Sequence, residues 1–536
     1  MRIALFCERE GIPTREGLER VAEMEEGAAR LRAGRREFLA GLGRIAAAGA
    51  LVPVVPPVAK ALTRPSGASV SIGIVGAGLA GLACGDLLKS NGINVSLYDA
   101  NTRTGGRCFS LREFFPGQTA ERGGEFIDNL HKTMLGYARR FKLTVEDVSK
   151  QPGEVLYYFN GQLYRESVVV DEFRQFVAAM HADLRALSGD VTADNHSDAD
   201  VRIDRTNLLE YLEGGNGAGF VAGPVAKAAI IQAYKAEYGL EAEEQSCLNF
   251  LLFIHADKRS KFTPFGVFSD ERYHVVGGND LIVQGLADGL TNQTHLEMRL
   301  VRVRKTSAGK IALTFKRGSS TVEQVHDAVV LSIPFTVLRE VELDLNLGLP
   351  PEKTLAIDRL GYGTNAKMMV RFSSRPWYGL GCNGASYSDL PNHQATWETN
   401  PANGTDARGV LTDYSSGKRG ANLNPNNVQA EASRFLGDLD LVLPGALAAA
   451  TVQNDKYVAL LEHWPSNPLA KGSYTCYTPG QFTTIAGNEG KPVGNLHFAG
   501  EHTNSFYIWQ GFMEGACLSG IDAANEIRQD IKVGNL

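Results

Sequence analysis

Short apolar runs alternate with helical patterns along most of the chain, and the first three elements are the clearest. Val70–Val75 is a short run of apolar and β-branched residues, which predicts a strand of a parallel sheet buried on both faces. The glycine-rich stretch Gly76–Gly81 follows at once and opens an amphipathic helix to about Ser90. A second strand, Asn94–Tyr98, then ends at Asp99. This order predicts the start of a βαβ unit.

The middle and the end of the chain continue the alternation. Three helical segments are predicted, at residues 171–187, 207–213 and 224–238, and a polar loop at 188–200. Strands alternate from His295 to Pro334, and residues 495–527 have the pattern of a strand, a loop and a long helix. The whole pattern predicts a mixed α/β fold.

Length and charge narrow the choice of protein class. At 536 residues the chain is too long for one hydrophobic core, so we expect two domains. The balance of 54 basic and 60 acidic residues gives a net charge of −6, and no stretch rich in Lys or Arg marks a surface for phosphates, so nucleic acid is not an expected partner. The 7 cysteines lack the spacing of a metal site or a disulfide framework, so we expect no metal and mostly buried thiols.

The N-terminal region carries an export pattern. Arg35-Arg36, followed by a Gly/Ala-rich apolar run at residues 40–59, resembles the signal of the twin-arginine export pathway. Arg44 and several prolines make this run a poor membrane-spanning helix, and an uncleaved anchor is the alternative. We expect residues 1–61 to be a signal region recognised by the twin-arginine export machinery, and the protein to be periplasmic or secreted. A start at Met24 would make residues 1–23 an annotation artefact.

The glycine-rich turn after the first strand has a physical role in its context. Gly76 makes the tight turn, Gly78 lets the backbone approach a pyrophosphate, and Gly81 brings helix against strand. The helix N-terminus offers free N–H groups and the positive end of its dipole to the phosphates. Asp99, at the end of the second strand, can accept hydrogen bonds from both ribose hydroxyls. The segment therefore predicts a dinucleotide site.

Four further motifs decide between the dinucleotides. Gly105-Gly106-Arg107 and Arg122–Ile127 follow the βαβ start, whereas Leu496–Thr503 and Gly511–Ala516 lie near the end of the chain. With these motifs the sequence resembles the flavin-containing amine oxidase superfamily, which includes monoamine, polyamine and L-amino-acid oxidases. The resemblance implies FAD and oxidation of an amine to an imine, which hydrolyses to an aldehyde or keto acid plus ammonia or an amine. Dioxygen would be reduced to hydrogen peroxide.

Because the motifs lie at both ends, the predicted FAD-binding domain is discontinuous and Rossmann-like. It comprises residues 70–150, 272–340 and 455–536, and the inserted substrate-binding domain comprises residues 151–271 and 341–454. The resemblance implies that the Arg107 guanidinium reaches the pyrophosphate, that Leu300 contacts adenine, and that the helix after Gly511 points at the flavin. The full set of expected cofactor-binding residues is Gly76, Ala77, Gly78, Leu79, Ala80, Gly81, Asp99, Ala100, Gly106, Arg107, Gly123, Gly124, Glu125, Phe126, Leu300, Gly500, Glu501, Gly511, Phe512 and Met513.

The same resemblance implies a catalytic lysine. Lys367 is the only charge in the apolar run at residues 366–370, and relatives carry a lysine on a strand beside the flavin, where it would hold a water and support the reduction of dioxygen. A lysine facing outward from an edge strand is the alternative.

Aromatic side chains are expected to guide the amine to the flavin. Phe512 and Tyr474 match the two walls of the superfamily, Trp464 matches a neighbouring tryptophan, and Trp509 is a further candidate. Ser473 stands where animal monoamine oxidases have the cysteine that attaches flavin, which predicts non-covalent FAD.

The substrate is less well specified. Phe126 stands where L-amino-acid oxidases of the superfamily usually have an arginine for the α-carboxylate, which favours a simple amine. An L-amino acid is the alternative, because Arg259 or Arg272 could bind the carboxylate. The acidic segment Glu237–Glu244 could attract a polyamine, but a solvated helix face is more typical of it. A homodimer is left open, and a carotenoid- or protoporphyrinogen-type desaturase is the less favoured enzyme class.

Overall fold

The computed structural model describes residues 70–254, 264, 269–400 and 406–536. The predicted export signal at residues 1–61 and the candidate Arg259 lie outside the described residues. By contact density residues 70–536 form one compact unit, which is the part described below.

A five-stranded parallel sheet forms the first layer. Its strands are β1 (Ser71–Val75), β2 (Asn94–Tyr98), β9 (Thr294–His295), β13 (Ala328–Leu331) and β22 (Leu496–Phe498), in the order β22-β13-β1-β2-β9. These strands come from three separate parts of the sequence, so the prediction of a discontinuous Rossmann-like domain in a mixed α/β fold is confirmed. From its second residue onward β1 is fully buried, as its uninterrupted apolar pattern predicted.

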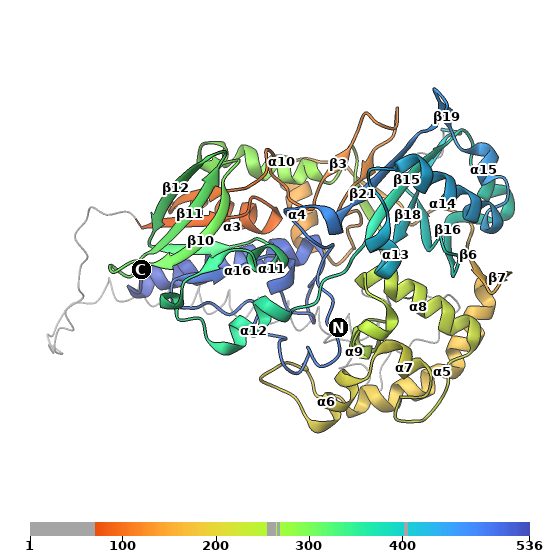
Figure 1. Cartoon of the computed structure of the whole chain (residues 1–536), viewed down its shortest axis with the longest axis horizontal. Coiled ribbons are helices and arrows are strands. Elements are labelled where there is room, and N and C mark those ends of the chain that lie inside the picture. Colours follow the sequence, from red (N-terminus) through yellow and green to blue (C-terminus); the bar gives the residue numbers. More distant parts are fainter. Residues whose placement is uncertain (1–69, 255–263, 265–268, 401–405) are drawn as a thin grey trace, which may run out of the picture. The chain divides into compact units, whose positions relative to one another are not determined.

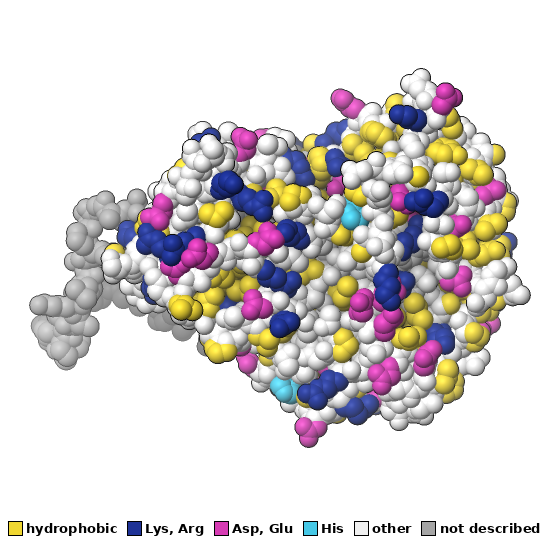
Figure 2. Space-filling model, viewed as in Figure 1, with side chains coloured by type: hydrophobic (Ala, Val, Ile, Leu, Met, Phe, Trp, Pro, Cys, Tyr) yellow, Lys and Arg dark blue, Asp and Glu magenta, His cyan; other side chains and the backbone are white. Residues whose placement is uncertain are grey.

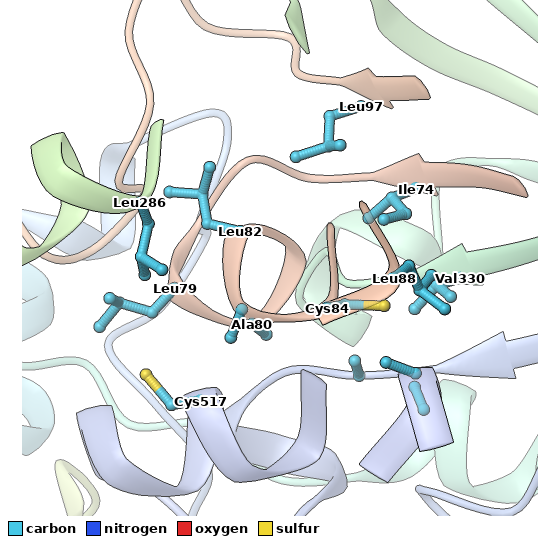
Figure 3. Close-up of a cluster of buried hydrophobic side chains, with 14 of the residues drawn as sticks. Ile74, Leu79, Ala80, Leu82, Cys84, Leu88, Leu97, Leu286, Val330 and Cys517 are labelled. Atoms are coloured by element: carbon cyan, nitrogen blue, oxygen red, sulfur yellow. The ribbon is translucent and has the colours of Figure 1, made fainter. Parts of the chain in front are cut away.

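Two helices pack on one another beside this sheet. Helix α3 (Leu79–Ser90) begins at the glycine turn, and α16 (Met513–Val533) crosses it in close contact. Figure 3 shows Ala80 of α3 and Cys517 of α16 in the space between the two helices. A Cβ on Gly520 would lie 2.0 Å from the carbonyl oxygen of Ala80, so glycine permits the two backbones to touch.

A smaller, four-stranded sheet is separate from the parallel sheet. It has the order β12-β11-β10-β14 and comprises β10 (Arg299–Lys305), β11 (Ile311–Arg317), β12 (Ser320–His326) and β14 (Glu342–Leu343). The antiparallel pairs β10–β11 and β11–β12 account for the alternating strands expected between residues 295 and 334.

A seven-stranded mixed sheet forms the second large layer, in the order β21-β15-β18-β17-β16-β6-β7. Its strands are β6 (Glu154–Phe159), β7 (Gln162–Arg165), β15 (Ala366–Phe372), β16 (Cys382–Ser388), β17 (Ala395–Glu398), β18 (Gly409–Ser415) and β21 (Ala459–His463). Strand β21 lies in the range expected for the FAD-binding domain but pairs with β15. Strand β21 thus belongs to the seven-stranded sheet.

Helices α5–α9 gather together beside this sheet (Figure 1). They are α5 (Glu166–Ala186), α6 (Asp198–Arg205), α7 (Leu208–Leu212), α8 (Pro224–Tyr238) and α9 (Cys247–Ile254). Helix α6 is not among the predicted helices. Its first turn falls in the stretch predicted as a polar loop, where Ser197 and Asp200 form a reciprocal capping box. The bounds of α8 match the expected helix.

The remaining strands and α-helices are short, except for α14. The strands are β3 (Ser110–Leu111), β4 (Ala120–Glu121), β5 (Val145–Asp147), β8 (Tyr273–Val275), β19 (Val452–Gln453) and β20 (Lys456–Tyr457). The helices are α4 (Lys132–Arg140), α10 (Asp280–Asp288), α11 (Phe335–Leu338), α12 (Pro351–Arg359), α13 (Gly417–Asn422), α14 (Val428–Val442) and α15 (Ala446–Ala449).

Surface and core agree with the composition. Basic and acidic side chains are interspersed on the face shown in Figure 2, without a continuous basic surface. The six described cysteines are all free and buried, as expected. Among the described residues no helix is both long and apolar enough to cross a membrane, and no group of His, Cys, Asp or Glu side chains is arranged to hold a metal ion.

Candidate active site

A large cavity opens where the carboxyl ends of the parallel strands face the seven-stranded sheet. Its lining includes residues that follow β1, β2, β13 and β22, among them Gly76, Asp99, Ser332 and Gly500. The other wall comes from β15–β18 and from the end of α8. Ligands of open parallel α/β sheets bind outside the carboxyl ends of the strands, so this cavity is the candidate site.

Glycines shape the turn at the nucleotide end of the cavity. Gly76 has a φ of 105°, a left-handed conformation that side chains disfavour. A Cβ on Gly81 would lie 1.9 Å from the carbonyl oxygen of Gly76, which explains why the helix can start so close to the strand. A Cβ on Gly78 would meet nothing within 4 Å, so this backbone is open to the cavity. The turn thus leaves room for a pyrophosphate at the N-terminus of α3.

Asp99 lines the cavity just beyond β2. Its Oδ2 accepts a hydrogen bond from the Ala77 N–H at 2.7 Å, and its Oδ1 accepts one from the Asn101 N–H at 2.8 Å. Burial raises the pKa of Asp99, and these two hydrogen bonds oppose the rise. Each carboxylate oxygen keeps an accepting position, so the backbone orients the carboxylate without consuming its capacity to bind hydroxyls.

Arg107 connects the two ends of the chain. Its Nη1 donates to the Ser473 carbonyl at 2.6 Å and to Glu501 Oε1 at 2.9 Å, and Glu501 Oε2 accepts from the Thr475 hydroxyl at 3.0 Å. All four residues line the cavity. The ion pair fixes the guanidinium beside the turn that follows β22.

Lys367 faces inward, which excludes the outward-facing alternative. It lies on β15, an interior strand between β21 and β18, and is 3% exposed. Its Nζ donates to the carbonyls of Glu121 (3.0 Å) and Gly123 (2.8 Å) and to Glu125 Oε2 (2.6 Å). An ammonium has three donors, so these acceptors occupy all of them. The charge is therefore fixed in place next to the cavity.

Aromatic rings surround the middle of the cavity. The Tyr474 hydroxyl donates to the Ala236 carbonyl at 3.3 Å and accepts from the Tyr414 hydroxyl at 3.1 Å. Trp397 donates from Nε1 to Glu125 Oε1 at 2.9 Å and packs against Tyr414 with ring centroids 5.3 Å apart. Phe512 lines the cavity as well. Glu125 thus positions both the ammonium of Lys367 and one aromatic wall.

Three carboxyl groups lie at the same end of the cavity. Asp128, Glu237 and Glu271 all belong to its lining. Burial, followed by the charge of Asp128, raises the pKa of Glu237 to about 8, and burial raises that of Asp128 to about 7. Burial and then the charge of Glu237 raise the pKa of Glu271 well above its ordinary value. The interpretation of Glu237 as part of a solvated helix face is therefore wrong.

Most of the expected site residues meet at this cavity, including Lys367, Tyr474, Phe512 and Trp464. Trp509 instead packs behind the wall, against His131 (centroids 4.5 Å apart) and Phe512 (5.6 Å). Ala77 and Gly81 support the turn without lining the cavity. Arg272 forms an ion pair with Asp147, with Nε and Oδ2 2.9 Å apart, and does not line the cavity. It is therefore not the carboxylate-binding group considered above.

Comparison with known proteins decides the family. The model of the family described as flavin containing amine oxidoreductase matches residues 79–528, which is most of the chain. The chain belongs to this family.

Similar proteins of two kinds are found. L-amino-acid oxidase of Notechis scutatus scutatus is 24% identical over 489 residues, covering 85% of this chain and 86% of that protein. L-amino-acid oxidase of Siganus canaliculatus is 26% identical over 476 residues, covering 85% of each. Cyclohexylamine oxidase of Brevibacterium oxydans IH-35A superposes with a TM-score of 0.71 at 20% identity, covering 87% of this chain and 100% of that one. Putrescine oxidase bound to putrescine superposes with a TM-score of 0.70 at 18% identity, covering 86% and 99%.

The flavin-containing family implies FAD, and the residues present fit it. The open backbone at Gly78, the carboxylate of Asp99 and the basic Arg107 line one continuous cavity that reaches Lys367 and Tyr474. When bound, FAD supplies the acceptor for a hydride equivalent from the carbon next to the substrate nitrogen. The protein contributes the aromatic lining of the cavity and the fixed positive charge of Lys367.

Sequence reasoning missed Trp397, Tyr414, Asp128 and Glu271. Tyr414 is the register partner of Lys367 across β15 and β18, a relation that no local pattern reveals. Asp128 follows the Arg122–Ile127 motif directly, so its position beside a cofactor motif was an available signal. No sequence signal marks Glu271. Its unusual left-handed backbone, with a φ of 44°, is known only from the structure.

Proposed function

We propose that this flavin-dependent amine oxidase acts on amines that carry no α-carboxylate. The observation that carries the proposal is the charge of the reaction end of the cavity, which presents three carboxyl groups and one lysine already bound to Glu125. Among the described lining residues the arginines, Arg103, Arg107 and Arg299, lie on the nucleotide-binding segments. An α-carboxylate would thus meet acidic groups without a bidentate partner.

A substrate panel tests this proposal. We expect primary alkylamines to bleach the flavin anaerobically and to release hydrogen peroxide in air, and L-amino acids to be poorer by about 100-fold or more in kcat/KM, because an unpaired buried charge costs about 3 kcal/mol. Equal or better rates with L-amino acids would contradict the proposal and would agree with the names of the relatives found by sequence. A protein that no amine or amino acid reduces would contradict oxidase activity itself.

We further propose that FAD is bound non-covalently. The hydroxyl of Ser473 donates to Asn365 Oδ1 at 2.5 Å and offers no sulfur for a thioether. Cys108, the only cysteine among the described lining residues, lies on the nucleotide-binding loop. Acid or denaturant should therefore release FAD into the supernatant. Flavin absorbance that stays with the precipitated chain would refute this.

We also propose that residues 1–61 direct export of the protein through the twin-arginine machinery. This proposal is supported by the Arg35-Arg36 pair and the apolar run that follows. Replacing both arginines by lysine should leave active, FAD-loaded enzyme in the cytoplasm, because substrates of this pathway cross the membrane folded. Fractionation of cells that express the two forms measures the effect, and unchanged export would rule the signal out.

A further inference from the structure

Among the described residues, no Lys or Arg side chain pairs with the three carboxyl groups at the reaction end of the cavity. In the described part of the chain Glu237 and Glu271 accept no side-chain hydrogen bond and pair with no basic group. Burial, followed by the charge of Asp128, raises the pKa of Glu237, and burial, followed by the charges of Glu237 and other acids, raises that of Glu271. Asp128 is 1% exposed, and its Oδ2 has no hydrogen-bond partner, although it lies 3.3 Å from Nε2 of buried His131. Burial lowers the pKa of His131 to about 3, so this imidazole is neutral and supplies no positive charge. Buried carboxyl groups are ordinarily paired, so within the described part of the chain this cluster lacks the positive charge that would complete it.

The position of Glu237 at the end of α8 is unfavourable for the stability of the helix. Glu237 lies in the last turn of α8, where the negative end of the helix dipole disfavours a carboxylate. Its side chain is only partly covered, although it lies deep in the protein, because its free surface faces the cavity. The Glu271 N–H donates to Asp128 Oδ1 at 2.8 Å, which holds these two acids together. The carboxyl groups are thus directed at a ligand rather than at the protein.

The surroundings identify the kind of cation. Tyr387, Tyr414 and Tyr474 line the same cavity as Glu237. Burial raises the pKa of each tyrosine, and the charge of Glu237 adds to the rise. Aromatic faces combined with carboxylates suit an alkylammonium group, which gains both ion pairing and cation–π attraction. The oxygens of the described acids do not form a metal-binding arrangement. The cluster therefore fits an organic cation better than a metal ion.

We propose that Glu237 and Glu271, together with Asp128, bind a second ammonium group of the substrate, so that the enzyme selects α,ω-diamines over monoamines. This inference rests on the proposed amine oxidase function. One amine of the substrate lies between Tyr474 and Phe512 at the flavin, and the other lies among the three carboxyl groups. The step at the flavin is unchanged: the carbon next to the first nitrogen gives up a hydride equivalent, the nitrogen loses a proton, and dioxygen takes up the two electrons as hydrogen peroxide.

The test compares two substrates of similar length, diaminobutane and pentylamine, with the FAD-loaded enzyme. We expect kcat/KM for the diamine to exceed that for the monoamine by about tenfold to 100-fold, as for a charge-assisted contact in a buried site. Glu237→Gln and Glu271→Gln should each lower the ratio of diamine to pentylamine kcat/KM by about tenfold, because only the diamine carries the second ammonium group. Glu213→Gln, which removes an exposed acid of the same helical region paired with Lys227, is the matched control and should change neither.

The outcomes separate the two proposals. Equal kcat/KM for both amines in the wild-type enzyme, or an equal loss of both substrates in the two glutamine variants, would overturn the second ammonium site while oxidase activity stands. Failure of both amines to reduce the flavin, with reduction by an L-amino acid, would overturn the proposed function itself. A series from diaminopropane to diaminooctane then measures the separation of the two sites by the chain length of highest kcat/KM.

Discussion

Lys367→Met should slow the reoxidation of reduced FAD by dioxygen by about tenfold or more, equivalent to at least ~1.4 kcal/mol of activation free energy, and should affect reduction by the amine much less. The ammonium is held by three acceptors in a buried position beside the cavity, so its charge is already oriented when negative charge develops on dioxygen. Stopped-flow absorbance separates the two half-reactions.

The same substitution should lower the free energy of unfolding by about 3–5 kcal/mol, because it leaves the Glu125 carboxylate buried without its cation. The double variant Lys367→Met/Glu125→Gln is the control, since glutamine can still accept from Trp397 without a charge. We expect it to regain most of the stability but none of the reoxidation rate. Wild-type reoxidation in a folded, FAD-loaded Lys367→Met enzyme would assign Lys367 a purely structural role.

Gly520→Ala should destabilise the protein by about 3 kcal/mol, the upper end of the range for overpacked cores. The added Cβ would lie 2.0 Å from the backbone carbonyl of Ala80, and backbone cannot move aside as a side chain can. Separation of α16 from α3 also shifts the helix N-terminus that faces the cavity, so the affinity for FAD should fall. Chemical denaturation and FAD titration measure the two effects.

Gly437→Ala is the matched control, because Gly437 lies on an exposed side of α14 and a Cβ there would meet nothing within 4 Å. This change should stabilise the protein by up to about 1 kcal/mol through helix propensity. If both alanine variants have similar stability, the close contact of the two helices does not limit packing.

The sequence predicted those parts of the site whose residues lie close together in the chain and form a recognisable motif. The glycine turn, the strand before it and Asp99 lie close together in the chain, and each residue type has a backbone or charge reason for its place. Lys367 was identifiable because it resembles the lysine that relatives carry on a strand beside the flavin, and because it is the lone charge in an apolar run. The partner, Glu125, was expected only as a cofactor contact, and its role in holding both Lys367 and Trp397 emerged from the structure.

The acidic end of the cavity could not be read from sequence. Asp128, Glu237 and Glu271 come from three distant segments. Only Asp128 has a sequence signal, its place directly after a cofactor motif, whereas Glu237 and Glu271 each resemble an ordinary surface acid when considered alone. The amphipathic pattern of α8 gave no reason to bury Glu237, because helix periodicity does not show that a cavity lies on that face. Likewise, Tyr414 meets Lys367 only through strand register. Local patterns predict contacts to a cofactor better than they predict the walls of a substrate pocket.

The order of strands in the parallel sheet also constrains biosynthesis. On the ribosome β1 and α3 emerge early. Strand β1 can pair with β13, and β13 with β22, only after these later strands have been synthesised, and α3 is covered only once α16 is present. Pairing over such separations is slow, and the apolar faces of the early elements stay uncovered while the chain grows. The nucleotide pocket is complete only when nearly the whole polypeptide has been translated, so we expect FAD to bind after translation.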